Sequence, residues 1–302
     1  MDVPMTMKVV QPEGAKMGVF VEGFIAAKAT EDDIAALRAA VYRHKIVVLK
    51  DQDLPPQEFV ELGRRFGEPA VYYQSMYHHP EQKEIFVSSN IGNGDGKAGV
   101  PKTGRFWHSD YQFMPAPYSI TFIYPQVVPK KSRGTYFIDM GQAYQRLPAK
   151  LKEVINGTYC WHSARRYFKI RPSDVYRPIG EIQDEIELET PPVRHPTVFA
   201  HPVTGEPTLY ISEAGTYRID DRNGNELSGS TGTLRTLFEA IGQLDSNFCH
   251  ENIHLQTFTE GDLLVWDNRS LTHHALHSSE PEPAKSFRVT VYDGLPYLGE
   301  LV

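Results

Sequence analysis

His108 and Asp110 stand two positions apart in the segment Trp107-His108-Ser109-Asp110, and both are residue types that bind metal ions. If this segment is a β-strand, residues two apart point to the same face, so the imidazole and the carboxylate converge. A second imidazole, His273, follows a predicted strand and turn late in the chain. Two histidines and one carboxylate form a facial triad, which leaves one face of iron(II) open for a bidentate 2-oxo acid and O₂. The alternative is that these side chains are buried polar groups with hydrogen-bonding roles only.

Arg288 lies 15 positions after His273, in an apolar run that predicts a strand. A guanidinium can hold a carboxylate through two parallel hydrogen bonds, so Arg288 is a candidate for anchoring a dicarboxylic co-substrate. The alternative is a structural salt bridge, because a buried arginine on a strand needs an anionic partner in any case.

Two further clusters are candidates for binding a substrate. Residues 72–77 read Tyr-Tyr-Gln-Ser-Met-Tyr, and residues 165–169 read Arg-Arg-Tyr-Phe-Lys. Phenols and an ammonium group suit carboxylates, which favours a small-molecule carboxylate as the substrate. The alternatives are half-buried tyrosines with packing roles and a solvated basic face.

Helical and strand patterns indicate how these residues are positioned. Acidic residues after Thr30 and apolar residues at helical spacing predict a helix over 31–44, followed by a buried strand over 46–49 and a second helix from Pro55 to Phe66. Short runs rich in β-branched and aromatic residues predict strands over 106–111, 119–124, 135–138, 208–212, 253–258, 263–266 and 286–292. Two further helices are predicted between the strands, over 142–155 and 233–244.

Many short strands with a few helices favour a mainly β fold with flanking helices, built on a jelly-roll core, the double-stranded β-helix. We expect a single domain over 1–302, with a helix and strand preface over about 20–70 and the jelly-roll core over about 104–295. The glycine-rich residues 90–99 precede the candidate metal segment, so they are a candidate lid.

Composition excludes several classes of partner. The net charge is −7, and the basic residues are scattered along the chain, which argues against nucleic acid. Two cysteines, 89 positions apart, suggest neither a zinc site nor a disulfide framework and fit a reducing cytoplasm. The sequence lacks an apolar stretch of membrane-spanning length, so we expect a soluble protein in the cytoplasm. A homo-oligomer is compatible with the sequence, which does not define the oligomeric state.

The order of these motifs resembles the taurine dioxygenase superfamily of 2-oxoglutarate oxygenases. The matching features are His-x-Asp at 108–110, Gly-Thr at 134–135, Trp-Asp-Asn-Arg-x-x-x-His-x-Ala at 266–275, and a strand arginine at 288, and the resemblance spans about 20–295. It implies that Fe(II), 2-oxoglutarate and O₂ are used, with His108, Asp110 and His273 as iron ligands. By the same resemblance Arg288 pairs with the distal carboxylate of 2-oxoglutarate, Thr135 hydrogen-bonds to it, and His274 is not a ligand.

A narrower resemblance links the chain to the isonitrile-forming non-haem iron oxidases of isonitrile lipopeptide biosynthesis. It implies that Tyr72, Tyr73, Tyr77 and Lys169 hold the two carboxylates of an N-carboxymethyl-3-amino acid. It also implies that Arg133 and Arg288 bind anionic groups near the co-substrate, and that His277 lies on a mobile segment beside the iron. The expected product is a 3-isocyano acid, formed with two O₂ and two 2-oxoglutarate.

Other classes of function stay open at this point. One is a hydroxylase of the same superfamily that acts on an alkyl sulfonate, an aryloxy acid or a modified amino acid. Against a sulfonate, Tyr292 stands where taurine dioxygenase has a second arginine. The remaining classes are a jelly-roll protein that uses the same residues for zinc-type hydrolysis or simple binding, and a structural module.

Overall fold

The structure is a computed structural model, and it describes residues 7–92, 100–131, 133–276 and 282–302. The chain forms two compact units, which we describe one at a time. The first unit comprises Met1–Arg105, Tyr118–Phe137 and His254–Leu295, and the second comprises Phe106–Pro117, Ile138–Ile253 and Pro296–Val302. The expectation of a single domain over 1–302 stays a prediction.

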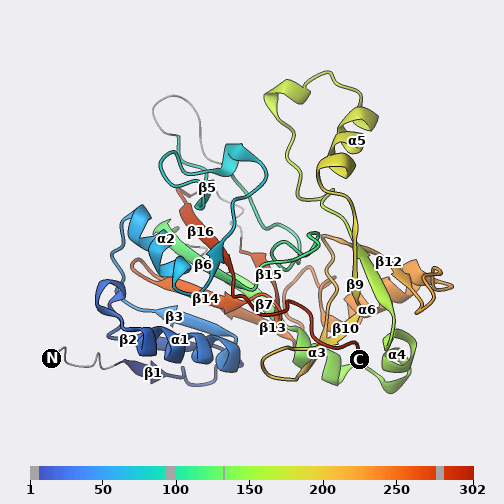
Figure 1. Ribbon diagram of the computed structural model, residues 1–302, viewed down its shortest axis with the longest axis horizontal. Helices are drawn as coiled ribbons and strands as arrows, with labels where there is room; N and C mark the ends of the chain where they lie inside the picture. Colours follow the sequence, from blue (N-terminus) through green and yellow to red (C-terminus); the bar gives the residue numbers. More distant parts are fainter. Residues whose placement is uncertain (1–6, 93–99, 132, 277–281) are drawn as a thin grey trace. The chain divides into compact units, whose positions relative to one another are not determined.

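The first unit is built mainly from strands (Figure 1). Its helical elements are η1 (Ala26–Lys28), α1 (Glu31–His44), α2 (Pro56–Arg64) and η2 (Ser75–Tyr77). Its strands are β1 (Lys8–Val10), β2 (Val19–Glu22), β3 (Ile46–Leu49), β4 (Glu68–Pro69), β5 (Phe86–Ser89), β6 (Ile120–Val127), β7 (Thr135–Asp139), β13 (Ile253–Gln256), β14 (Leu263–Asp267), β15 (Leu271–Ala275) and β16 (Lys285–Tyr292). A large sheet has the order β1-β2-β3-β14-β6-β16-β4, with β5 also paired to β16, and a smaller sheet has the order β13-β7-β15.

The centre of the large sheet, where β3 and β14 lie, is buried on both faces. Along β3, Val47 and Leu49 belong to the cluster that contains the apolar residues of α1 and α2, such as Leu37. Ile46 and Val48 belong to a second cluster that contains residues of β7 and β15 from the smaller sheet. Successive side chains of a strand point to opposite faces, so this alternation places the helices on one face and the smaller sheet on the other. The prediction of a mainly β, jelly-roll core with flanking helices is confirmed.

The helix α1 begins where the sequence indicates. Thr30 accepts a hydrogen bond from the backbone N–H of Asp33, and the Asp33 carboxylate accepts one from the backbone N–H of Thr30. This reciprocal capping satisfies two of the donors that every helix leaves unpaired at its start. The predicted bounds of the helix, 31–44, are those observed.

The second unit combines small sheets with helices. Its helical elements are α3 (Met140–Arg146), α4 (Ala149–Ile155), η3 (Pro172–Asp174), α5 (Ile179–Glu189) and α6 (Ser230–Ile241). Its strands are β8 (Tyr159–His162), β9 (Val193–Pro196), β10 (Val198–Ala200), β11 (Pro207–Leu209) and β12 (Thr216–Asp220). They form a three-stranded sheet of order β12-β8-β9 and the pair β10-β11.

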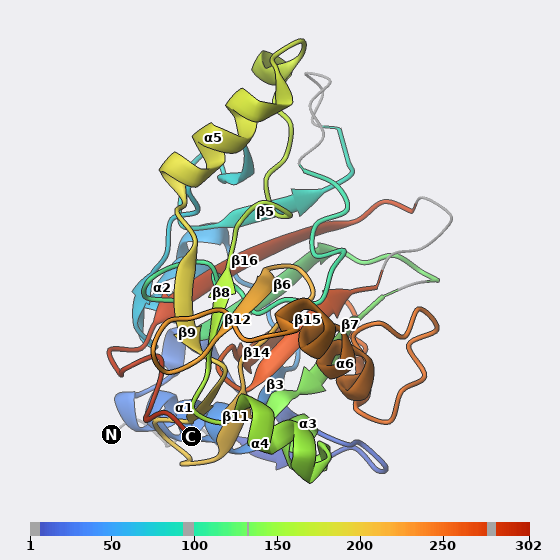
Figure 2. The same cartoon turned by 90° about the vertical axis from the view of Figure 1, so that its right-hand side faces the viewer.

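The helix α5 lies at the end of two long connections, away from the sheet β12-β8-β9 of its own unit in both views (Figure 1 and Figure 2). Its position is fixed by ion pairs: Arg171 and Arg177 each bind both Asp174 and Glu185, over distances of 2.5–2.9 Å. Tyr176, in the same segment, is fully exposed.

Two of the expected elements are wrong, and one helix was not expected. Residues 106–111 do not form a strand: His108 lies in an isolated bridge, and a turn begins at Asp110. The predicted helix over 142–155 is two helices, α3 and α4, because Pro148 interrupts the helical hydrogen bonds. The helix α5 was not predicted at all.

The two cysteines differ in their surroundings. Cys160 on β8 is buried, and burial raises the pKa of its thiol to about 12, although a hydrogen bond with Thr197 opposes the shift. Cys249, after α6, is exposed. Among the helices that the structure describes, none is both long and apolar enough to cross a membrane.

Candidate functional site

The backbone around His108 selects which of its ring nitrogens can bind a metal. His108 is buried, and its Nδ1 lies 2.7 Å from the carbonyl oxygen of Phe106. Because that carbonyl can only accept a hydrogen bond, Nδ1 carries the proton and Nε2 is left with a lone pair for a metal. The ring of Tyr167 packs edge-on against the imidazole at 5.7 Å and limits its rotation.

Asp110 approaches His108 through a turn and not along a strand. The backbone N–H of Gln112 donates to the carbonyl of Ser109 at 3.3 Å, and Tyr111 takes a positive φ of 60°. Left-handed backbone is uncommon outside glycine, and it turns the chain directly after the carboxylate. As a result, Oδ1 of Asp110 lies 3.9 Å from Nε2 of His108, and both side chains are buried.

His273 lies in the middle of β15, in the first unit. β15 pairs with β7 in the smaller sheet, so its backbone is held by a regular ladder. The imidazole packs against Trp266 at 4.9 Å and against Phe137 at 6.0 Å between ring centroids. The imidazole therefore packs against two large aromatic rings, which also contact each other at 5.4 Å.

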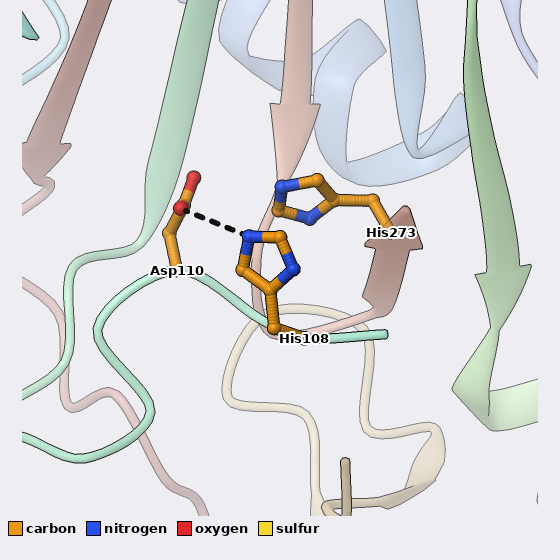
Figure 3. A group of neighbouring side chains, drawn as sticks. All are labelled: His108, Asp110 and His273. Carbon is orange, nitrogen blue, oxygen red and sulfur yellow. Dashed lines mark ion pairs between the residues drawn. The ribbon is translucent and has the colours of Figure 1, made fainter. Parts of the chain in front are cut away.

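One ligand atom of each of His108, Asp110 and His273 can be chosen so that the three atoms lie within 4.8 Å of one another (Figure 3). The donors are two imidazole nitrogens and one carboxylate oxygen, a set that suits iron(II) and leaves coordination positions open. By number, type and spacing of donors, these residues fit an iron ion.

Arg288 and the tyrosines of residues 72–77 gather around one ring, that of Phe86. In the ladder between β16 and β5, Arg288 stands opposite Phe86, and its guanidinium carbon lies 4.1 Å from the ring centroid. Tyr77 stacks on the same ring at 4.3 Å, and Tyr72 packs edge-on at 5.1 Å. Tyr73 contacts Tyr72 at 4.4 Å. The structure therefore brings these four sequence candidates together.

Burial sets the protonation of Tyr77. Burial raises the pKa of its phenol well above the usual value, Tyr73 adds to the shift, and the positive charge of Arg288 opposes it. The phenol is therefore neutral at neutral pH, and a neutral phenol can donate a hydrogen bond to a carboxylate.

The other sequence candidates lie as follows. Thr135 opens β7 and is half-buried, directly after Gly134, whose φ is 147°. A Cβ on Gly134 would lie 2.8 Å from the carbonyl oxygen of Gln256, so a larger residue does not fit there. Arg133 is exposed and Lys169 is half-buried. His277, and most of the candidate lid over 90–99, lie outside the described residues.

Sequence reasoning missed the aromatic rings that hold the candidates in place: Phe86, Phe137 and Tyr167. A signal existed only for Tyr167, which lies inside the basic and aromatic run 165–169. Phe86 and Phe137 are ordinary apolar residues of strands, and nothing in their own neighbourhoods indicates which distant side chain they contact.

The fold and the site define a non-haem iron dioxygenase that uses Fe(II), 2-oxoglutarate and O₂. The chain belongs to the taurine catabolism dioxygenase TauD, TfdA family, whose model matches residues 11–290. It is 30% identical to pentalenolactone F synthase of Streptomyces arenae, over 95% of this chain and 96% of that protein. It is 25% identical to (S)-phenoxypropionate/alpha-ketoglutarate-dioxygenase of Delftia acidovorans, over 93% of this chain and 92% of that protein. A taurine dioxygenase structure from Burkholderia xenovorans has the same fold, with a TM-score of 0.70, 21% identity and coverage of 97% of this chain and 91% of that chain.

Proposed function

We propose that this dioxygenase converts an N-carboxymethyl-3-amino acid, such as 3-[(carboxymethyl)amino]butanoate, into a 3-isocyano acid. The observation that carries the proposal is the group of Tyr72, Tyr73, Tyr77 and Arg288 around Phe86. The phenols provide several hydrogen-bond donors, which suit an anionic substrate better than an apolar one, and the guanidinium beside them provides the positive charge that we assign to the co-substrate.

In this proposal His108, Asp110 and His273 hold the iron. Arg288 pairs with the distal carboxylate of 2-oxoglutarate and Thr135 hydrogen-bonds to it, while Arg133 adds positive charge. With 2-oxoglutarate bound, the iron supplies the activation of O₂ that oxidises a nearby carbon.

The residues around the substrate decide which carbon is oxidised. The tyrosines and Lys169 bind the two carboxylates of the substrate, one at each end. Holding both ends would fix the N–CH₂ carbon between them, and such orientation can supply much of the selectivity. His277 is assigned to substrate binding by the resemblance alone.

The overall reaction is balanced with two equivalents of co-substrate. Conversion of R–NH–CH₂–COOH into R–NC and CO₂ removes four hydrogen atoms, which is a four-electron oxidation. Each 2-oxoglutarate and O₂ accept two hydrogen atoms and give succinate, CO₂ and water. Two turnovers therefore account for one isonitrile, two succinates, two waters and three molecules of CO₂.

A second candidate function is hydroxylation of an aryloxy acid, an alkyl sulfonate or a modified amino acid. The relative from Delftia acidovorans favours this function. The name of that protein states an aryloxy acid, and this chain covers 92% of it. The sulfonate is the weakest of the three, because Tyr292 replaces the expected second arginine with a neutral phenol.

Product stoichiometry separates the two candidates. The enzyme is loaded anaerobically with Fe(II) and 2-oxoglutarate, then given O₂ and 3-[(carboxymethyl)amino]butanoate that carries ¹³C in the carboxymethyl carboxylate. We expect two succinates per isonitrile and release of the label as CO₂, measured by mass spectrometry. The N-ethyl analogue, which lacks that carboxylate, is the control and should give no isonitrile.

One succinate per hydroxylated product, with the label retained, would favour the second candidate. Succinate that forms at the same rate with and without the substrate would reject the proposed substrate.

A further inference from the structure

Arg269 and Asp293 form a buried ion pair in the first unit. Nη1 of Arg269 lies 2.7 Å from Oδ2 of Asp293, and Nη2 lies 2.9 Å from Oδ1, so the pairing is bidentate. Both side chains are 0% exposed. Arg269 also donates to the carbonyl of Leu295 at 3.3 Å, and Asp293 accepts hydrogen bonds from the hydroxyl groups of Tyr42 and Ser119.

The pair connects two elements that carry proposed site residues. Arg269 lies in the turn between β14 and β15, four positions before His273. Asp293 directly follows β16, the strand that carries Arg288. The ion pair therefore connects the turn before His273, the proposed metal ligand, with the end of the strand that carries Arg288, the proposed co-substrate anchor.

The turn that holds Arg269 is itself rigid. Asp267 accepts hydrogen bonds from the backbone N–H of Arg269 at 3.0 Å and from the hydroxyl of Ser270 at 2.6 Å. The side-chain amide of Asn268 donates to Thr121 on the neighbouring strand β6 at 2.7 Å. With the turn fixed in this way, a displacement of Arg269 is passed on to the start of β15.

Net stability is a weak explanation for this pair. Removing two charges from water costs free energy that their attraction often only offsets, so apolar residues of similar size can stabilise a fold equally well. A bidentate pair does fix the distance and angle between its two backbones. The geometry that the pair imposes on the two backbones therefore explains its presence better than a contribution to stability does.

We propose that Arg269 and Asp293 are positioning residues, which set where His273 stands relative to Arg288. The inference rests on the proposed roles of those two residues as iron ligand and 2-oxoglutarate anchor. It predicts that metal affinity and 2-oxoglutarate affinity fall together when the pair is removed, even where the fold is retained.

The test compares the double variant Arg269→Met/Asp293→Leu with Asp262→Asn. The double variant replaces both charges by apolar groups, so that no charge stays buried alone. The control, Asp262→Asn, removes the carboxylate of a different ion pair. Asp262 lies directly before β14 of the same sheet, and its Oδ1 is 2.5 Å from Nζ of Lys50. Anaerobic calorimetry measures binding of Mn(II) and then of 2-oxoglutarate, and thermal melting measures stability.

We expect the double variant to melt within a few degrees of the wild type and to lose at least tenfold in the affinity for each of Mn(II) and 2-oxoglutarate. Asp262→Asn should melt earlier and keep both affinities. Should the double variant not fold, Arg269→Lys serves instead: it keeps the charge but loses the bidentate geometry, and the same joint loss of affinity is expected.

A folded double variant that keeps both affinities within about twofold of the wild type would overturn the inference and leave the proposed function intact. A wild-type chain that binds no Mn(II) would overturn the proposed iron site, and this inference with it.

Discussion

Lys169 is the half-buried cation that the proposal assigns to a substrate carboxylate. Replacing Lys169 by Ala should raise KM for 3-[(carboxymethyl)amino]butanoate by about tenfold or more, because a charge-assisted hydrogen bond contributes about 1.5–3 kcal/mol. Affinity for iron should not change. Steady-state kinetics and a metal titration measure the two effects, with Lys150→Ala, at an exposed lysine of α4, as the control. Loss of iron from Lys169→Ala would contradict the assigned role.

Tyr77 offers a second test, because its ring and its hydroxyl have separate roles. Tyr77→Phe keeps the stacking on Phe86 but removes the hydroxyl that would donate to the substrate. We expect kcat/KM to fall by about tenfold with little change in melting temperature, given the usual contribution of a hydrogen bond to a charged group. The exposed Tyr217→Phe is the control, and an unchanged kcat/KM for Tyr77→Phe would remove Tyr77 from the proposed site.

At the scale of residues, the candidate side chains and their spacing can be read from the sequence, but their geometry cannot. The spacing of His108 and Asp110 is visible in the sequence, but the argument from a strand was wrong, since a turn with a left-handed Tyr111 brings the two together. The contact between Arg288 and Phe86 arises from strand pairing between distant segments, and such pairing cannot be derived from local patterns.

The strand β7 depends on a glycine at its start. Gly134→Ala would place a Cβ 2.8 Å from the Gln256 carbonyl oxygen, at a φ that L-residues rarely adopt. We expect a loss of at least about 1 kcal/mol of stability, together with weaker 2-oxoglutarate binding, because Thr135 follows directly. Urea denaturation and calorimetry measure the two quantities.

The matched control is Gly232→Ala in the helix α6, where a Cβ meets nothing within 4 Å. Alanine in a helix should stabilise by about 0.5–1 kcal/mol. If both substitutions have the same effect on stability and binding, the close approach at Gly134 has no special role.

Among the elements, those with a strong apolar pattern were predicted well. The helix α1 and the strand β3 have the predicted bounds, because α1 buries its apolar face in one cluster and β3 is buried on both faces, in two clusters. The split between α3 and α4 could have been predicted from Pro148, which disfavours helix in the residues before it and is compatible with the start of a new helix after it. A weak signal for α5 also existed, since Pro178 precedes Ile182 and Ile186 at helical spacing.

For the whole molecule, Asp293 gives stability a defined pH dependence. Burial alone would raise the pKa of its carboxyl group, but the hydrogen bonds and charge of Arg269, with hydrogen bonds from Tyr42 and Leu295, outweigh burial and lower the pKa to about 2. An aspartate in an unfolded chain has a pKa of about 3.9, so the folded state holds its proton more weakly. The stabilisation is therefore present above about pH 4 and is lost as the pH falls toward about 2.

The comparison of wild type with Asp293→Asn tests this dependence. At pH 7 the variant should be about 3–5 kcal/mol less stable, because Arg269 is left buried without its partner. The difference should begin to shrink below about pH 4. Urea denaturation at several pH values measures it, and a difference that stays constant down to about pH 3 would show that the carboxylate of Asp293 is not the cause.

The contrast between Cys160 and Cys249 makes the natural chain suitable for labelling at one chosen position. A maleimide reagent needs an accessible thiolate, which the exposed Cys249 can provide and the buried Cys160, with its raised pKa, cannot. Intact-mass analysis of the folded protein should show a single addition, and a second only after unfolding. A fluorophore or spin label can thus be attached next to α6 without introducing or removing a cysteine.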